Sequence, residues 1–249
     1  MIKFFRHIRK TIIMKNQRGK YLKYAIGEIV LVVIGILIAL SINTWNEDRK
    51  DRIAENELLK NLKSEYLINL QQLNNKLAGS EYDLHLTDSL ILRMNKNVPI
   101  QSEESFVILL GDISNPPSFD PNTGVMDDII STGKLALIRD NSLHQLITSW
   151  SGLLAESREI EQVLREKSRR QFIPFISEYI PIRLLYKKQF GASRFTWNSA
   201  DLMNNKLLEN HLVDFHRMHT VLIPRYKKLK ENLENTVQLI NKKELQEND

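Results

Sequence analysis

The sequence predicts an all-α protein, in which one N-terminal transmembrane helix continues into an elongated antiparallel helical bundle. An apolar run near the N-terminus and the scarcity of helix breakers, 9 Gly and 7 Pro in 249 residues, support this fold class. Apolar residues also recur at every third or fourth position over long stretches. We therefore expect long helices at about 46–97, 140–180 and 198–245, with short ones near 102–111 and 125–133.

The apolar run reads AIGEIVLVVIGILIALSINTW, from residue 25 to residue 45, and its first 18 residues contain only two polar side chains. As a helix these 18 residues extend about 27 Å, close to the roughly 30 Å of a hydrocarbon core. We expect a transmembrane helix at residues 25–45, with the lipid bilayer as its partner. A cleaved signal peptide is the alternative, but the long basic segment before the run and Glu28 within it argue against cleavage.

The charges on the two sides of this helix predict its direction. Residues 1–24 contain eight basic side chains and no acidic one: Lys3, Arg6, Arg9, Lys10, Lys15, Arg18, Lys20 and Lys23. Basic residues remain on the cytoplasmic side of a membrane. We therefore expect a basic cytoplasmic segment at 1–24 and an extracytoplasmic helical-bundle domain at 46–249.

The remaining charge excludes nucleic acid as a partner. Without those eight residues and Glu28, the totals of 35 basic and 30 acidic residues fall to 27 and 29, a net charge of −2. Phosphate binding needs a surplus of Lys and Arg. The stretch at 183–197 is basic and aromatic, yet it belongs to this slightly acidic domain, so we expect no nucleic-acid binding.

One face of the transmembrane helix predicts self-association. At 100° per residue, Gly35, Ala39 and Asn46 each fall within about 20° of Glu28 around the helix. Small residues on such a stripe let two membrane helices approach closely, and a polar side chain can bond across the pair. The alternative is that Glu28 lies near the headgroups and has only an interfacial role.

Local signals predict where the later helices begin and end. Ser102, Asp140 and Asn198 each precede an apolar-periodic segment, as helix-capping residues do. Gly79 with Ser80 indicates a break in the first long helix. Asp127 and Asp128 are expected in the first turn of a short helix, where the helix dipole favours acids. Pro174 and Pro181 should kink or end the helix from 140, and Pro224 should bend the last one.

The sequence contains no motif that predicts an enzyme. It has no cysteine, and the metalloprotease, nucleophile-elbow and dinucleotide patterns are absent. Lys134 follows Ser-Thr-Gly, but the residues around it do not fit a phosphate loop. His211, His216 and His219 come closest to a metal site, yet only the last two share a helix face. We expect no catalytic residue, metal or cofactor.

Two stretches resemble a bacterial family of uncharacterised single-pass envelope proteins, domain of unknown function 6090. They are YAIGEIVLVVIGILIALSINTWNE at 24–47 and ISTGKLALIRDNSLHQLITSW at 130–150. The resemblance implies a single-pass bacterial inner-membrane protein with a helical periplasmic domain, and it implies no known activity. We expect a non-catalytic interaction or scaffold module that binds an unknown envelope protein. The alternative is a ligand-sensing bundle that signals through the membrane helix to a separate partner.

Overall fold

A computed structural model describes residues 18–248, which divide between two compact units, Met1–Glu57 and Leu58–Asp249. The described residues form helices and turns and contain no strand, which confirms the predicted all-α class. Residues 1–17, and with them most of the predicted basic segment at 1–24, lie outside the described residues.

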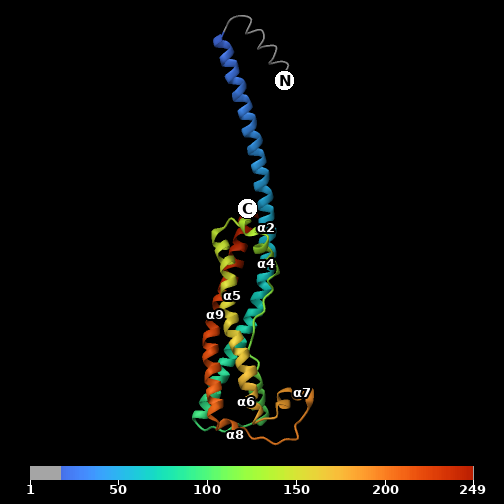
Figure 1. The fold of residues 1–249 in the computed structure, drawn as a ribbon, viewed down its shortest axis with the longest axis vertical. Helices are drawn as coiled ribbons and strands as arrows, with labels where there is room; N and C mark the ends of the chain where they lie inside the picture. The colour runs from blue at the N-terminus through green and yellow to red at the C-terminus, as the bar shows by residue number, and fades with distance from the viewer. Residues whose placement is uncertain (1–17, 249) are drawn as a thin grey trace. The chain divides into compact units, whose positions relative to one another are not determined.

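The helices follow one another along the chain with short connections (Figure 1). The α-helices are α2 (Arg18–Asn95), α3 (Glu103–Ile113), α4 (Gly124–Ser131), α5 (Asn141–Lys167), α6 (Ile173–Ser177), α7 (Lys187–Phe190), α8 (Ser199–Met203) and α9 (Lys206–Asn248). The described residues also contain two 3-10 turns, η1 (Lys134–Leu137) and η3 (Ile182–Tyr186), and one π-helical turn, η2 (Ser168–Phe172).

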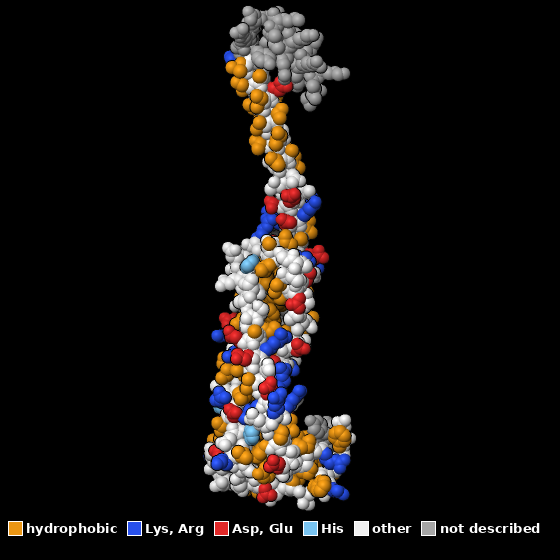
Figure 2. All heavy atoms as spheres, in the orientation of Figure 1, with side chains coloured by type: hydrophobic (Ala, Val, Ile, Leu, Met, Phe, Trp, Pro, Cys, Tyr) orange, Lys and Arg blue, Asp and Glu red, His pale blue; other side chains and the backbone are white. Residues whose placement is uncertain are grey.

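The first unit consists, in its described part, of the N-terminal portion of α2. From residue 29 to residue 45 its large apolar side chains are exposed, and none of the most apolar 18-residue window is buried. Figure 2 shows these hydrophobic side chains along the helix, followed by acidic and basic ones. This helix is long and apolar enough to cross a membrane.

α2 does not break at Gly79 and Ser80, so the break predicted there is wrong. Tertiary packing explains the difference, because the Ser80 side chain is fully buried. A Cβ at Gly79 would lie 3.8 Å from Cβ of Pro117. That distance is ordinary van der Waals contact, so the loop after α3 packs on α2 at this point, and burial offsets the low helix propensity of glycine. α2 ends at Asn95, and Asn97 has a left-handed φ of 50°.

The second unit is a bundle built on three long segments: α2 from residue 58, α5 and α9. α2 and α9 run antiparallel, since Nζ of Lys63 lies 2.6 Å from Glu244 and Nζ of Lys227 lies 3.1 Å from Glu81. α5 and α9 are also antiparallel, with Nζ of Lys167 2.6 Å from Asp214. Figure 1 shows the three segments side by side within this unit.

Apolar stripes from these segments fill the core of the second unit. The largest fully buried side chains come from all three long helices and from the shorter elements between them: Tyr66, Leu62, Leu73 and Leu90; Phe106, Leu110, Phe119 and Ile129; Leu143 and Phe172; and Phe215 and Tyr226. Burial of such side chains contributes about 1.5–3 kcal/mol each relative to exposure. The apolar spacing read from the sequence therefore corresponds to this core.

Two of the three predicted caps begin the expected helices. Ser102 accepts a hydrogen bond from the Ser105 amide at the start of α3, and Asp140 accepts from the amides of Ser142 and Leu143 at the start of α5. Asn198 instead caps the five-residue α8, and the last long helix begins only at Lys206. This corrects the predicted start, because a single cap pattern does not reveal how soon its helix ends.

The prolines act differently from one another. Just before Pro174 the helix widens into the π-helical turn η2, where the Ile173 amide donates to the Ser168 carbonyl. Proline has no amide hydrogen to donate to the preceding turn, which favours such a shift in the ladder. Pro224 lies inside α9, which continues past it to Asn248.

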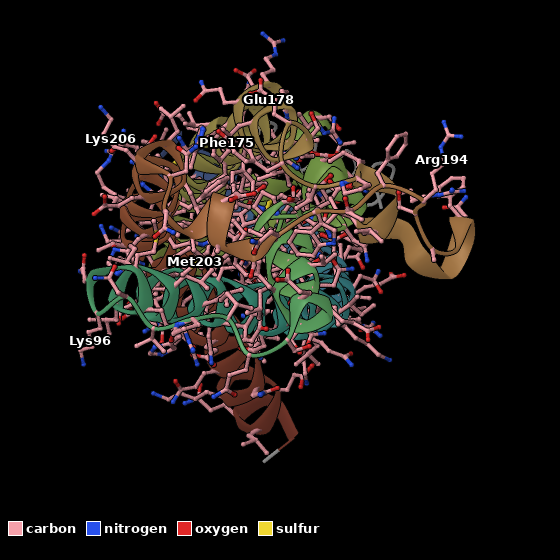
Figure 3. All side chains as sticks on the ribbon, turned by 90° about the horizontal axis from the view of Figure 1, so that it is seen from below. Lys96, Phe175, Glu178, Arg194, Met203 and Lys206 are labelled. Carbon is pink, nitrogen blue, oxygen red and sulfur yellow. The ribbon has the colours of Figure 1, made fainter. Side chains whose placement is uncertain are left out.

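One end of the second unit, seen in Figure 3, is formed by the turns between long helices. Phe175 of α6 is buried there and stacks on Tyr179 and His211, with ring centroids 5.3 and 5.0 Å away. Lys96, Lys206 and Arg194 point outward from this end. The basic and aromatic stretch expected at 183–197 therefore belongs to a surface turn in its described part.

Candidate functional site

The second unit buries a carboxyl group against an imidazole. Asp83 of α2 is 5% exposed and His219 of α9 is 2% exposed. The Oδ2 atom of Asp83 lies 3.6 Å from Nε2 of His219. Nδ1 of His219 is buried and finds no hydrogen-bond partner among the residues that the structure describes. Isolated charges are costly in such surroundings, so the protonation state of this pair determines its energy.

Burial favours the uncharged form of both groups. Burial, together with the Asp112 carboxylate of α3, raises the pKa of Asp83 to about 7. Burial, together with the smaller effect of His216 one turn earlier, lowers the pKa of His219 to about 4. The contact is therefore best described as a neutral carboxyl group beside a neutral imidazole, although its geometry would also fit an ion pair.

Asp83 also lines a pocket of about 790 Å³. The pocket lies between α2, the end of α3 and the loop that follows it, and the Tyr82 phenol donates to Asp112 at 3.2 Å across this region. Its lining includes three aspartates and one lysine: Asp83, Asp112, Asp120 and Lys76. The pocket is thus acidic, and it borders the buried carboxyl group.

His211 and His219, two of the three histidines that come closest to a metal-site pattern, lie in different surroundings. His219 contacts Asp83, whereas His211 packs against Phe172 and Phe175 at the end of the bundle. Within residues 18–248, no group of three or more His, Asp or Glu side chains is arranged to hold a metal ion. Burial and the nearby Lys167 lower the pKa of His211. His211 and His219 therefore contact different parts of the bundle.

A second buried carboxylate, Glu161 of α5, organises the loop after α3. Its side chain accepts hydrogen bonds from the Ser118 hydroxyl at 2.9 Å and the Phe119 amide at 3.2 Å. The Tyr226 phenol of α9 donates to it at 2.7 Å. Arg165 donates to Ser118 at 2.7 Å, which adds a positive charge near the carboxylate. Glu161 therefore joins α5, α9 and the loop.

α2 holds the other end of the same loop. Glu65 accepts from the amides of Val125 at 2.7 Å and Met126 at 3.3 Å, at the N-terminus of α4. Asn69 exchanges two hydrogen bonds with the backbone of Asn122, at 2.8 and 2.9 Å. A carboxylate at a helix N-terminus satisfies its free amides and complements its dipole. Residues 118–126 are thus fixed from two helices.

A groove of about 980 Å³ lies between this loop, α4 and α5. Apolar side chains contribute much of its lining, namely Phe119, Met126, Ile130, Trp150 and Leu154. Ile130 is 54% exposed, whereas Met126 and Trp150 are almost fully buried. Arg158, whose guanidinium lies 3.7 Å from Asp120, and Arg165 are on its polar side. The groove is therefore a surface of mixed polar and apolar character, with Ile130 as its exposed apolar side chain and charged residues at its borders.

The residues predicted for self-association all lie on α2 in the first unit. Because residues 28–46 are helical, Glu28, Gly35, Ala39 and Asn46 lie on one stripe, as their spacing requires. Glu28 is partly exposed and the other three are exposed. A Cβ at Gly35 would meet no atom within 4 Å. Pairing of two chains through this stripe stays a prediction.

Sequence reasoning did not single out the buried polar groups Glu65, Asn69, Asp83 and Glu161. Each lies in a helix with many other polar residues, and its partner lies elsewhere in the chain. The two acidic residues expected in the first turn of α4 differ in the structure. Asp127 is in that turn, whereas Asp128 pairs with Lys134, whose Nζ lies 2.7 Å away. Asp83 and Glu161 each occupy a position in the apolar stripe of their helix, and this position was the signal that could have indicated their burial.

In the described part of the chain, the fold and these contacts define a helical protein with one candidate membrane helix and a bundle whose helices are joined by buried polar contacts. A family model described as a family of unknown function, DUF6090, matches residues 28–154. The match covers just over half of the chain, so the chain belongs to this family. No curated protein and no solved structure matches it.

Proposed function

We propose that this chain is a membrane-anchored, non-catalytic interaction module of the bacterial envelope, with its N-terminus in the cytoplasm and its bundle in the periplasm. One observation carries the anchoring: the apolar stretch of α2 in the first unit is exposed along its whole length. Exposure of such a surface to water is unfavourable, because each Å² of exposed apolar area costs about 25 cal/mol. A bilayer covers it without any second protein.

The interaction role is supported by the groove beside α4. Its apolar floor and exposed Ile130 offer a contact surface, while its charged borders would orient a partner. The buried carboxylates Glu65 and Glu161 are engaged by backbone amides and hydroxyl groups. Such engagement is the use expected of structural rather than catalytic carboxylates. The partner we propose is another protein of the envelope.

Co-purification from mild detergent tests this function in the full-length chain. A stoichiometric protein partner should be retained by the unaltered chain and lost from Ile130→Glu, which places a charge in the groove. Val163→Glu is the matched control, because Val163 of α5 is similarly exposed at 43% and does not line the groove. Equal retention by both variants would contradict a role for the groove.

The pocket beside Asp83 favours a second candidate, a ligand-sensing bundle that signals through α2 to a separate cytoplasmic protein. Native mass spectrometry of the same preparation separates the two. A bound small molecule released without loss of any protein subunit would support sensing. A complex with a second polypeptide and no small molecule would support the interaction module.

A further inference from the structure

Asp83 faces a different set of groups on each element around it. On α9 it meets His219, with His216 one turn before; on α3 it faces Asp112; and on α2 its neighbour Tyr82 donates to Asp112. Lys76 and Asp120 complete the charged lining of the pocket. No hydrogen bond to the Asp83 carboxyl group is formed by the described part of the chain. Its main polar neighbour is therefore the imidazole of His219.

The pocket wall that faces Asp83 rests lightly on α2. Residues 111–120 form this wall, and Pro117 packs at Gly79, where a Cβ would already be in contact. The Tyr82–Asp112 hydrogen bond is exposed, which makes it weak. Away from α2, the Ser168 hydroxyl donates to the Ser114 carbonyl, and beyond Ser118 the hydrogen bonds of Glu161 hold the loop firmly. The wall can therefore move near Asp83 while its far end stays fixed.

We propose that Asp83 is a proton-dependent latch for this pocket. With its carboxyl group protonated beside neutral His219, the 111–120 wall stays closed on α2. When the proton leaves, the buried Asp83 carboxylate lies next to the Asp112 carboxylate. Repulsion between the two charges, together with the favourable hydration of the Asp83 carboxylate, moves the wall outward. The latch lies within the second unit, and it does not depend on a partner or on membrane insertion.

The direction of the pH dependence follows from the burial of Asp83. Its pKa of about 7 exceeds the ordinary value of 3.8, so the closed state binds a proton that the open, hydrated state releases. Opening of the wall therefore becomes easier as the pH rises above about 3.8, and the rise of the opening constant levels off above pH 7. If His219 stays in place, the opening constant should rise about tenfold between pH 6 and pH 8.

Hydrogen exchange of the full-length chain in detergent micelles, followed by mass spectrometry and corrected for intrinsic exchange rates, tests the latch. Peptides covering 111–120 should lose protection by about tenfold between pH 6 and pH 8. In Asp83→Asn, which mimics the protonated group, their protection should be independent of pH and remain at the low-pH level. Asp88→Asn, at an exposed position of the same helix, is the matched control and should behave like the unaltered chain.

A second variant keeps the test decisive if Asp83→Asn does not fold. Asp112→Asn removes the facing carboxylate, so the exchange of 111–120 should level off at a lower pH than in the unaltered chain. An unchanged profile in Asp112→Asn would overturn the proposal. Constant protection of this wall in the unaltered chain, or a full pH dependence surviving in Asp83→Asn, would overturn it as well.

Discussion

The phenol oxygen of Tyr226 lies 2.7 Å from a carboxylate oxygen of Glu161, and both side chains are buried. Burial and the adjacent carboxylate raise the pKa of Tyr226 far above its ordinary value, so its proton stays available for donation. Glu161 also binds the Ser118 hydroxyl and the Phe119 amide. One buried carboxylate therefore ties α5, α9 and the loop after α3 together.

Tyr226→Phe should lower the free energy of unfolding by about 1.5–3 kcal/mol, since a hydrogen bond to a charged group is lost in the core. Tyr66→Phe is the matched control. Tyr66 is also fully buried, but within residues 18–248 its hydroxyl has no hydrogen-bond partner, so removing it should be neutral or stabilising. Urea denaturation of the full-length chain in micelles gives both values. Equal losses in the two variants would contradict the role of the Glu161 contact.

Glu65→Ala should destabilise the bundle by about 1–3 kcal/mol, because the amides of Val125 and Met126 lose their acceptor. Thr123 cannot replace it, since its hydroxyl donates to Asp127 and makes no capping bond to α4. The same denaturation experiment measures the loss, with exposed Glu57→Ala as the control. Hydrogen exchange should show faster exchange localised to α4, and unaltered protection there would refute the capping role.

Separate substitutions of Asp83 and His219 should give opposite pH profiles of stability. In Asp83→Asn, the lowered pKa of His219 remains, so stability should be full above pH 6.5 and fall as pH drops toward 4. In His219→Gln, the raised pKa of Asp83 remains, so stability should fall as pH rises from about 4 to about 7. The limiting slope for either group is about 1.4 kcal/mol per pH unit.

The unaltered chain should show a flatter profile between about pH 4 and 6.5, because the two slopes oppose each other there. Thermal unfolding across this range measures all three curves. Asp112, His216 and Tyr82 contribute in the unaltered chain and in both variants, so they do not reverse the sign of either comparison. Profiles of the same sign in the two variants would contradict the neutral-pair description.

Gly35→Ile should reduce the yield of dimers captured by chemical crosslinking in membranes. The larger side chain would keep two helices from approaching closely along the predicted pairing stripe on α2. Gly27→Ile makes the same change about 100° from Glu28 around the helix, off the stripe, and should leave the dimer yield intact. A Cβ at either glycine meets no atom within 4 Å, so neither substitution should disturb the helix itself. An undiminished yield in Gly35→Ile would remove the case for this interface.

Local signals predicted the helices well, whereas long-range partners could not be read from the sequence. Ser102 and Asp140 cap the expected helices, because capping depends on neighbours two or three residues away. Glu65 binds amides 60 and 61 residues later, and Glu161 reaches across 42 and 65 residues. No spacing rule relates such distant positions in a single sequence.

Two errors in the predicted elements have different physical origins. Gly79 with Ser80 resembles a helix break, yet the contact with Pro117 and the burial of Ser80 keep α2 helical. Asn198 caps a helix as predicted, but that helix ends at Met203 and α9 begins separately. Tertiary packing overrides local propensity in the first case, and helix length is not encoded by the cap in the second.

The central proposal, a membrane anchor with the bundle outside the cytoplasm, is tested most directly by cysteine labelling in intact cells. The chain has no cysteine, so Thr11→Cys and Ser131→Cys each create a single reactive site, the second at an exposed position. With the outer membrane permeabilised, a membrane-impermeant maleimide should label Ser131→Cys at once and Thr11→Cys only after the inner membrane is lysed. Labelling of Thr11→Cys alone before lysis, or of neither variant, would contradict this topology.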